Sequence, residues 1–224
     1  MSVFLTHHSS LRFWRQWREF RHCNPAPVRA RGYLGTRPAA KEIGDACARA
    51  LPGVEVPHVS LPGSLPGTPG YDAVFHRWAC ASERGSYARA FPGVYVASPE
   101  YLFLEMASFM ELEHLIEFGY ELCGRYVPSN ASLRGFAEVT PLTTAAKLAL
   151  FLSTAEGHRG LRKARRAVRQ VLDGAESPRE CVAMMLLTLP YLMGGNAVSK
   201  PALNVPIELT PRQQVRFGRS SVRC

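Results

Sequence analysis

Apolar residues recur at helical spacing in several parts of this chain. After Ser98 and Pro99, a capping residue and a first-turn proline, apolar residues follow at spacings of one, three and four through Met110. This pattern predicts a helix. The same reasoning predicts four more helices, over 112–125, from Thr143 or Thr144 through Ser153, over 158–173, and from Ser177 through Leu189.

The start of the chain predicts two further helices. Over Ser9–His22, Phe13 and Trp17 share one face and arginines take another, with Ser9 or Ser10 as the cap. This arrangement is typical of an amphipathic helix docked on a core, although aromatic residues among cations can also stack nucleic-acid bases. Pro38 is suited to begin the second helix, which runs from Ala39 to Leu51.

Prolines and glycines recur between residues 52 and 70, and they leave room only for short strands. We predict such strands over 54–61, 73–78, 94–97, 203–209 and 215–223. The fold class is therefore α+β, mainly helical with short strands. We divide it into a turn-rich N-terminal module with an amphipathic first helix, residues 1–93, and a helical region, residues 94–224.

Charge divides the chain unevenly. The net charge is +6 over residues 1–50, −5 over residues 51–157 and +8 over residues 158–224. The whole chain has a net charge of +9. The basic ends have two open interpretations: they fold against the acidic middle, or they present basic surfaces to phosphates.

The predicted helix over 158–173 concentrates this charge, because its cations precede any acid. These cations are the candidate nucleic-acid-binding residues: Arg159, Arg162, Lys163, Arg165, Arg166 and Arg169. Contacts from them to phosphates would release counterions and make binding sensitive to salt. The alternative is that their long side chains cover a helix that packs on the glutamates of residues 111–121.

The predicted compartment and the predicted lack of a cofactor rest on sequence features that are absent. The longest apolar runs, 145–152 and 182–189, are far shorter than the roughly 20 residues of a membrane helix, and we find no export signal. The six cysteines are scattered without a two-residue gap, which favours free thiols in a reducing cytoplasm. His114 lies near several glutamates on a stretch that we interpret as a solvated face. We therefore predict a cytoplasmic protein that contacts no membrane and has no metal site and no cofactor.

Motifs of nucleophilic catalysis and of nucleotide binding are absent from the sequence. One carboxylate has a distinctive setting, since Ser177-Pro178-Arg179-Glu180 is a capping box. In this motif the Ser177 hydroxyl accepts from the Glu180 N–H and the Glu180 carboxylate reaches back. The capping role accounts for Glu180 without any catalytic one.

Several segments, taken in order, resemble a bacterial family of actinobacterial type. Its front part is like type IV abortive-infection antitoxins, and its end is like very-short-patch-repair and restriction endonucleases. The segments that carry the resemblance are Val94–Glu100 with the helix start after it, Gly160–Ala167, Ala175–Glu180 and Pro201–Asn204.

This resemblance implies that Glu180 lines a nuclease site, and that a strand with an Asp and then an acidic pair with a His follow. The sequence ends at Cys224, where that Asp would come. By analogy we expect an incomplete endonuclease-like layer with no catalytic residue of its own. Glu180 would be catalytic only if another chain completes the site.

These observations predict a non-catalytic DNA-binding or protein-binding component of a bacterial defence or toxin–antitoxin-type system. The first alternative is a Mg²⁺-dependent endonuclease that completes its site with another chain, the one case in which Mg²⁺ is expected. The second is a purely protein-binding module. The sequence does not decide between DNA and a protein as partner, nor does it indicate an oligomeric state.

Overall fold

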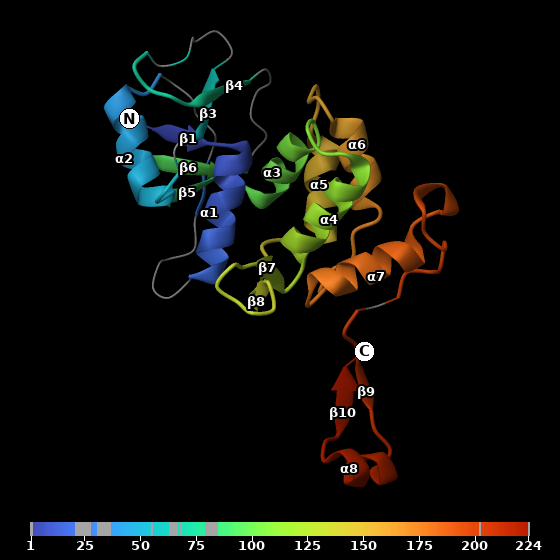
Figure 1. The fold of residues 1–224 in the computed structure, drawn as a ribbon. Coiled ribbons are helices and arrows are strands. Elements are labelled where there is room, and N and C mark those ends of the chain that lie inside the picture. The colour runs from blue at the N-terminus through green and yellow to red at the C-terminus, as the bar shows by residue number, and fades with distance from the viewer. Residues whose placement is uncertain are drawn as a thin grey trace.

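A computed structural model of residues 1–224 describes residues 2–20, 28–30, 37–54, 56–62, 67, 69–78, 85–201 and 203–223. It shows an α+β fold in which a mixed sheet and a group of helices lie side by side (Figure 1). The predicted fold class is confirmed at this level.

Six strands form the main sheet in the order β2-β5-β6-β1-β3-β4. They are β1 (Val3–Leu5), β2 (Val28–Ala30), β3 (His58–Pro62), β4 (Val74–Trp78), β5 (Tyr87–Phe91) and β6 (Val94–Ala97). The predictions over 73–78 and 94–97 thus correspond to β4 and β6. The strand predicted over 54–61 begins later, at His58.

The central strand β1 was not predicted. It runs parallel to β6, with Val3 opposite Val94, and antiparallel to β3, with Leu5 opposite Val59. All three of its side chains are buried, because helices cover both faces of the sheet. A strand buried on both faces shows no apolar–polar alternation, and three residues are too few to reveal any period.

Helices cover the two faces of the sheet unequally (Figure 1). On one face lies α2 (Ala40–Ala50), which corresponds to the predicted second helix, and on the other lie α1 (His7–Glu19) and α3 (Pro99–Met106). All eight residues of α3 are buried. This helix is apolar on nearly every side because it lies between the sheet and the remaining helices.

The helical region next to α3 contains the three predicted helices and one strand pair that was not predicted. It contains α4 (Leu112–Cys123), α5 (Ala145–Thr154), α6 (Leu161–Val168) and a small hairpin of β7 (Tyr126–Pro128) and β8 (Phe136–Glu138). As predicted, Ser98 and Thr144 cap α3 and α5 by accepting from the N–H groups of Tyr101 and Lys147. The helix predicted over 158–173 is shorter and spans only α6.

The C-terminal part comprises α7 (Pro178–Thr188), η1 (Tyr191–Met193), β9 (Pro206–Glu208), α8 (Pro211–Phe217) and β10 (Ser221–Arg223). The antiparallel pair β9 and β10, with α8 between them, projects away from the rest (Figure 1). The prediction of a strand over 215–223 is wrong for its first part, which belongs to α8. Pro211 at the first helical position and a capping box from Thr210 to Gln213 start this helix, which runs through Phe217.

The first helix differs from its prediction at both ends. It begins at His7, and the end predicted at His22 lies outside the described residues. Neither serine caps the helix, since both are buried within its first turn. The Ser9 hydroxyl accepts from His58 N at 2.8 Å, and the Ser10 hydroxyl donates to Leu5 O and accepts from Ala97 N, both at 2.9 Å.

Cys47, Cys123 and Cys181 are buried free thiols. Burial raises the pKa of Cys47, because the thiolate would lose its hydration. Cys23, Cys80 and Cys224 lie outside the described residues. None of the helices in the described part of the chain combines the length and the apolar character of a membrane span.

We predict that Ser10→Ala destabilises the protein by about 1–3 kcal/mol, because it leaves the buried Ala97 N–H and Leu5 C=O without this hydroxyl. Urea unfolding followed by circular dichroism measures the change. Ser153→Ala is the matched control, since the Ser153 hydroxyl is exposed and bonds only to Leu150 O. We expect it to shift the free energy of unfolding by less than about 0.5 kcal/mol. Equal effects would contradict the role of Ser10.

Candidate functional site

The exposed side of α6 carries a row of cations. Ala164, Ala167 and Val168 form its buried side, and the N-terminal cap is Gly160 at φ +84°. A Cβ at Gly160 would come within 2.7 Å of the Ala107 backbone, so this position requires glycine and holds α6 close against the end of α3. We call four exposed arginines the arginine row: Arg159, just before Gly160, and Arg162, Arg166 and Arg169, which come after it.

The other two predicted cations of this segment have structural roles. Lys163 Nζ donates to Met110 O at 2.7 Å, just beyond the end of α3. The Arg165 guanidinium donates to Leu152 O at 2.8 and 3.0 Å and to Ala155 O at 3.1 Å, and so satisfies carbonyls at the end of α5. These two side chains tie α6 to its neighbours.

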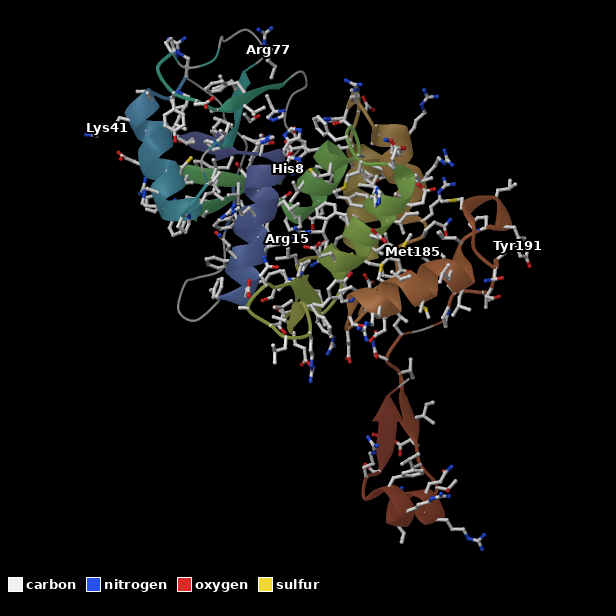
Figure 2. All side chains as sticks on the ribbon, viewed as in Figure 1. His8, Arg15, Lys41, Arg77, Met185 and Tyr191 are labelled. Carbon is white, nitrogen blue, oxygen red and sulfur yellow. The ribbon has the colours of Figure 1, made fainter. Side chains whose placement is uncertain are left out.

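The arginine row is not neutralised by the acidic middle of the chain. Among the described residues, three glutamates form ion pairs, and none of their partners belongs to the arginine row. These pairs are Arg15 with Glu121, Arg134 with Glu138 and His7 with Glu105. Figure 2 shows Arg15 on α1 facing the helical region, where it makes a bidentate contact with Glu121 at 2.7 and 2.8 Å. Although α6 packs on α4, the row therefore faces solvent, with no ion pair to another described residue.

Glu180 takes part in capping α7, but its carboxylate reaches back to Glu176 N and to the Ser177 hydroxyl, and not to the Ser177 N–H of the predicted capping box. Its N–H donates to the Ser177 hydroxyl at 3.2 Å, and its carboxylate accepts from that hydroxyl at 3.2 Å and from Glu176 N at 2.9 Å. Asn204 also donates to this carboxylate, at 3.1 Å. Within the described ranges no group of three or more His, Cys, Asp or Glu side chains could hold a metal ion.

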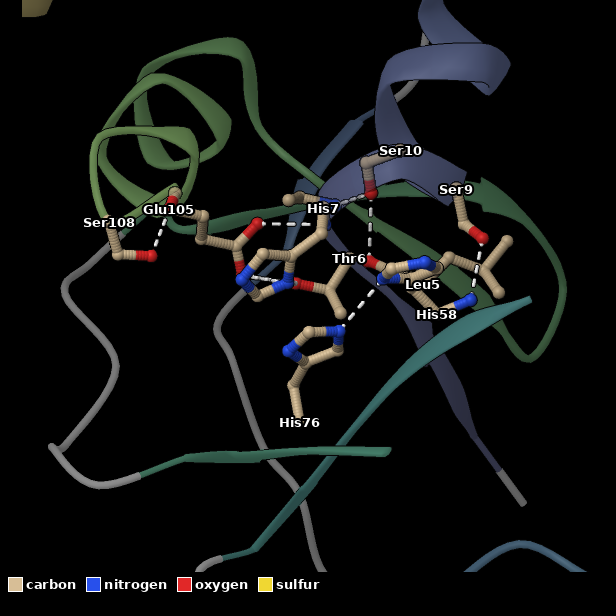
Figure 3. A network of polar contacts seen from close by, with 10 residues as sticks. Leu5, Thr6, His7, Ser9, Ser10, His58, His76, Glu105 and Ser108 are labelled. Atoms are coloured by element: carbon tan, nitrogen blue, oxygen red, sulfur yellow. Dashed lines mark hydrogen bonds and ion pairs between the residues drawn. The ribbon is translucent and has the colours of Figure 1, made fainter. Parts of the chain in front are cut away.

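A second cluster, not anticipated from the sequence, lies where β1 passes into α1. His7 begins α1 at φ +48°, and its N–H donates to Glu105 Oε2 at 3.1 Å. The Thr6 hydroxyl bonds to the other Glu105 oxygen and to His7 Nδ1, the latter at 3.0 Å. Figure 3 shows this chain of contacts from α3 to the start of α1.

Two histidines of the sheet extend the cluster. The His76 ring stacks on that of His7 with centroids 3.7 Å apart, and its Nε2 lies 2.8 Å from His58 Nδ1 (Figure 3). One of these two nitrogens must carry a proton and the other must not. The contact therefore requires that the two rings not both be protonated.

Burial controls the ionisation of this cluster. It raises the pKa of Glu105 to about 7, an effect that the hydrogen bonds from Thr6 and His7 only partly offset. Burial and the neighbouring histidines lower the pKa of His7 to about 3 and that of His76 to about 4. At neutral pH the His7 and His76 rings are therefore uncharged, and burial favours the protonated form of Glu105.

A pocket of about 170 Å³ opens beside this cluster between the sheet and the helical region. We call it the histidine pocket. Its lining comprises His7, Ser60, His76, Arg77, Tyr101, Leu104, Glu105, Ser108, Gly157, His158 and Arg159. It meets the arginine row at Arg159, which belongs to both.

Sequence reasoning missed the pocket because its residues are far apart along the chain. The available signal was Glu105, an acid inside an otherwise apolar helical run, since such residues are buried only with partners. Nothing in the sequence links it to His58 and His76. The histidine singled out by its acidic neighbours, His114, is exposed on α4.

No family model matches this chain, and neither a curated protein nor a solved structure matches it.

We predict that Glu105→Gln changes the pH dependence of stability. A carboxyl whose folded pKa is about 7, against the usual 4.5, destabilises the fold progressively as pH rises from about 4.5 to 7. Relative to wild type, the glutamine variant should therefore gain on the order of 3 kcal/mol across this window. Urea unfolding at several pH values measures the difference.

The control for this measurement is Glu138→Gln, because Glu138 is exposed and its ion pair within the described part of the chain is with Arg134, which is also exposed. Its stability curve should run parallel to that of wild type over the same pH range. If the Glu105→Gln curve were also parallel to the wild-type curve, the proposed ionisation of Glu105 would be wrong.

Proposed function

We propose that the chain is a non-catalytic DNA-binding component of a bacterial defence or toxin–antitoxin-type system, and that the arginine row contacts DNA phosphates. The observation that carries the proposal is the exposure of four arginines that no acid in the described part of the chain neutralises. Arginine binds phosphate oxygens bidentately, and so suits such contacts. The biological setting rests on the resemblance described above.

The spacing of the row suits a phosphate backbone. Arg162, Arg166 and Arg169 lie four and three residues apart and share one side of the helix. At 1.5 Å per residue the first and last are about 10 Å apart along the axis. One DNA strand carries a charge every 3.4 Å or so along its own axis, so the row is long enough to meet about three phosphates.

A second group of cations supports a role for both basic ends of the chain. Arg212, Arg216 and Arg219 are exposed on α8 and the turn after it, in the part that projects from the body (Figure 1). The Arg216 guanidinium carbon lies 5.7 Å from the centroid of the Phe217 ring, and Phe217 is itself half exposed. An exposed aromatic ring beside a cation can stack on an unpaired base.

The protein-binding alternative is favoured by a different surface. Val182, Leu186 and Leu187 are exposed on α7, and Tyr191 and Leu192 are exposed in η1, where Figure 2 shows Tyr191 at the outer edge of the molecule. Contiguous exposed apolar residues are typical of protein contacts. Under this alternative a stoichiometric partner co-purifies with the wild type but not with Leu186→Asp, and substitutions in the arginine row do not change the behaviour of the protein toward DNA.

We predict that the protein binds duplex DNA with a logarithmic salt slope of about −3 to −4, from about three phosphate contacts along α6 and a fourth at Arg159. Arg162→Ala, Arg166→Ala and Arg169→Ala should each reduce the slope by about 0.9 and leave the free energy of unfolding nearly unchanged. Fluorescence anisotropy across a salt series measures both affinity and slope. Absence of binding at low salt, or binding without a salt slope, would refute the proposal.

Two sets of variants serve as controls. Arg49→Ala removes an exposed arginine of α2, on the far side of the sheet from α6, and should leave the slope unchanged (Figure 1). Lys163→Ala and Arg165→Ala should lower stability, because each frees carbonyls of α5 or of the segment after α3. Plasmid cleavage with Mg²⁺ that Glu180→Gln abolishes would establish the nuclease alternative instead.

A further inference from the structure

The histidine pocket is placed where the arginine row begins. Arg159 lines the pocket, and Arg162 follows it by three residues on the exposed side of α6. Because Gly160 lies against the backbone of Ala107, the link between pocket and row is held in a fixed position. A strand whose phosphates follow the row therefore reaches the mouth of the pocket at Arg159.

The charges around the pocket favour an anion. Arg77, from the outer edge of β4 (labelled in Figure 2), and Arg159, from the turn before α6, both line the pocket and both are exposed. The carboxyl of Glu105 is the acid among the lining residues, and its oxygens already accept from Thr6 and from His7 N. Two guanidinium groups thus outweigh one carboxyl whose ionisation burial opposes.

The size of the pocket limits the ligand. Its volume of about 170 Å³ is below the range of about 300–1,000 Å³ that is typical of sites for whole cofactors or drug-sized molecules. It accommodates a small polar group, and the Ser60 hydroxyl lines it beside the arginines, whereas the Ser108 hydroxyl, which also lines it, donates to Glu105 O at 2.8 Å. A phosphate is such a group, and its oxygens match the guanidinium geometry.

The backbone beside the pocket is strained. His7 adopts φ +48°, a conformation that costs a residue other than glycine of order 1–3 kcal/mol. Such strain persists where surrounding contacts impose it, and it is concentrated at binding sites. Here it places the His7 ring against His76 and the His7 N–H on Glu105.

We propose that the histidine pocket binds a phosphate monoester, namely the terminal phosphate of a nucleic-acid strand that lies along the arginine row. This inference rests on the proposed DNA binding and adds to it a preference for phosphorylated ends. The row supplies affinity for any duplex, whereas Arg77 and Arg159 at the pocket mouth recognise the additional charge of a terminal phosphate.

The test compares short duplexes with 5′-phosphate, 3′-phosphate and hydroxyl ends, and closed circular DNA that has no ends. We expect one phosphorylated end to bind about tenfold tighter than the hydroxyl end. Arg77→Ala should abolish this preference and leave the affinity for circular DNA unchanged. Arg166→Ala should weaken binding to every probe by the same factor, and Arg49→Ala should change nothing.

Titration with inorganic phosphate provides a second readout that requires no DNA. It should shift the ring resonances of His76 in the NMR spectrum of the wild type, but not in that of Arg77→Ala. If phosphorylated and hydroxyl ends bind equally while circular DNA binds with the expected slope, the inference is overturned and the proposed function stands. If no DNA binds while phosphate shifts His76, both are overturned, and the pocket belongs to a free phosphate compound.

Discussion

Helix α1 buries polar side chains between two layers, and each must find a hydrogen-bond partner there. Burying such a group without a partner costs several kcal/mol in an apolar setting, so the partners determine how the layers meet. Ser10 bridges β1 and β6, the Trp14 indole donates to Ala97 O, and the buried Arg18 guanidinium donates to Glu121 O, Gly124 O and Thr140 O. The sheet, α1 and the helical region are therefore held as one unit (Figure 1).

The same requirement produces the histidine pocket. Glu105 points from the buried helix α3 toward the start of α1, where Thr6 and His7 satisfy both of its oxygens. His7 in turn accepts a left-handed backbone conformation in order to donate its N–H. A residue other than glycine disfavours this backbone conformation, but the hydrogen bond to Glu105 requires it. Such conflicts between local and tertiary preferences are expected at functional sites. The cluster is thus both part of the joint between the layers and the wall of a pocket.

On α6 the structure divides residues of one chemical type between two roles. Lys163 and Arg165 lie on the flanks of the helix, within reach of free carbonyls at the ends of neighbouring segments. Arg162, Arg166 and Arg169 are exposed and form no ion pair with another described residue. Packing therefore explains Lys163 and Arg165 on the flanks, whereas it does not account for the exposed arginine row.

The sequence by itself determined the elements whose causes are local. Caps at Ser98, Thr144 and Ser177, prolines in first turns and helical periodicity placed α3, α5 and α7, and the Ser177 hydroxyl accepts from the Glu180 N–H as the spacing indicated. Each of these depends on residues within one or two turns of each other. The strand β1 and the roles of Ser9 and Ser10 depended on partners far along the chain, and could not be read from local pattern.

Only the tertiary structure decided the site. His7, His58, His76 and Glu105 come from four separate elements, and no spacing in the sequence relates them. It also decided which cations of the predicted basic helix remain available, because that depends on where the carbonyls of α5 and Met110 lie in space. Caps and helical periodicity depend on residues that are close in sequence, so the sequence reveals them. Burial and hydrogen bonds between distant residues arise only when the sheet packs against the helices, so only the tertiary structure reveals those.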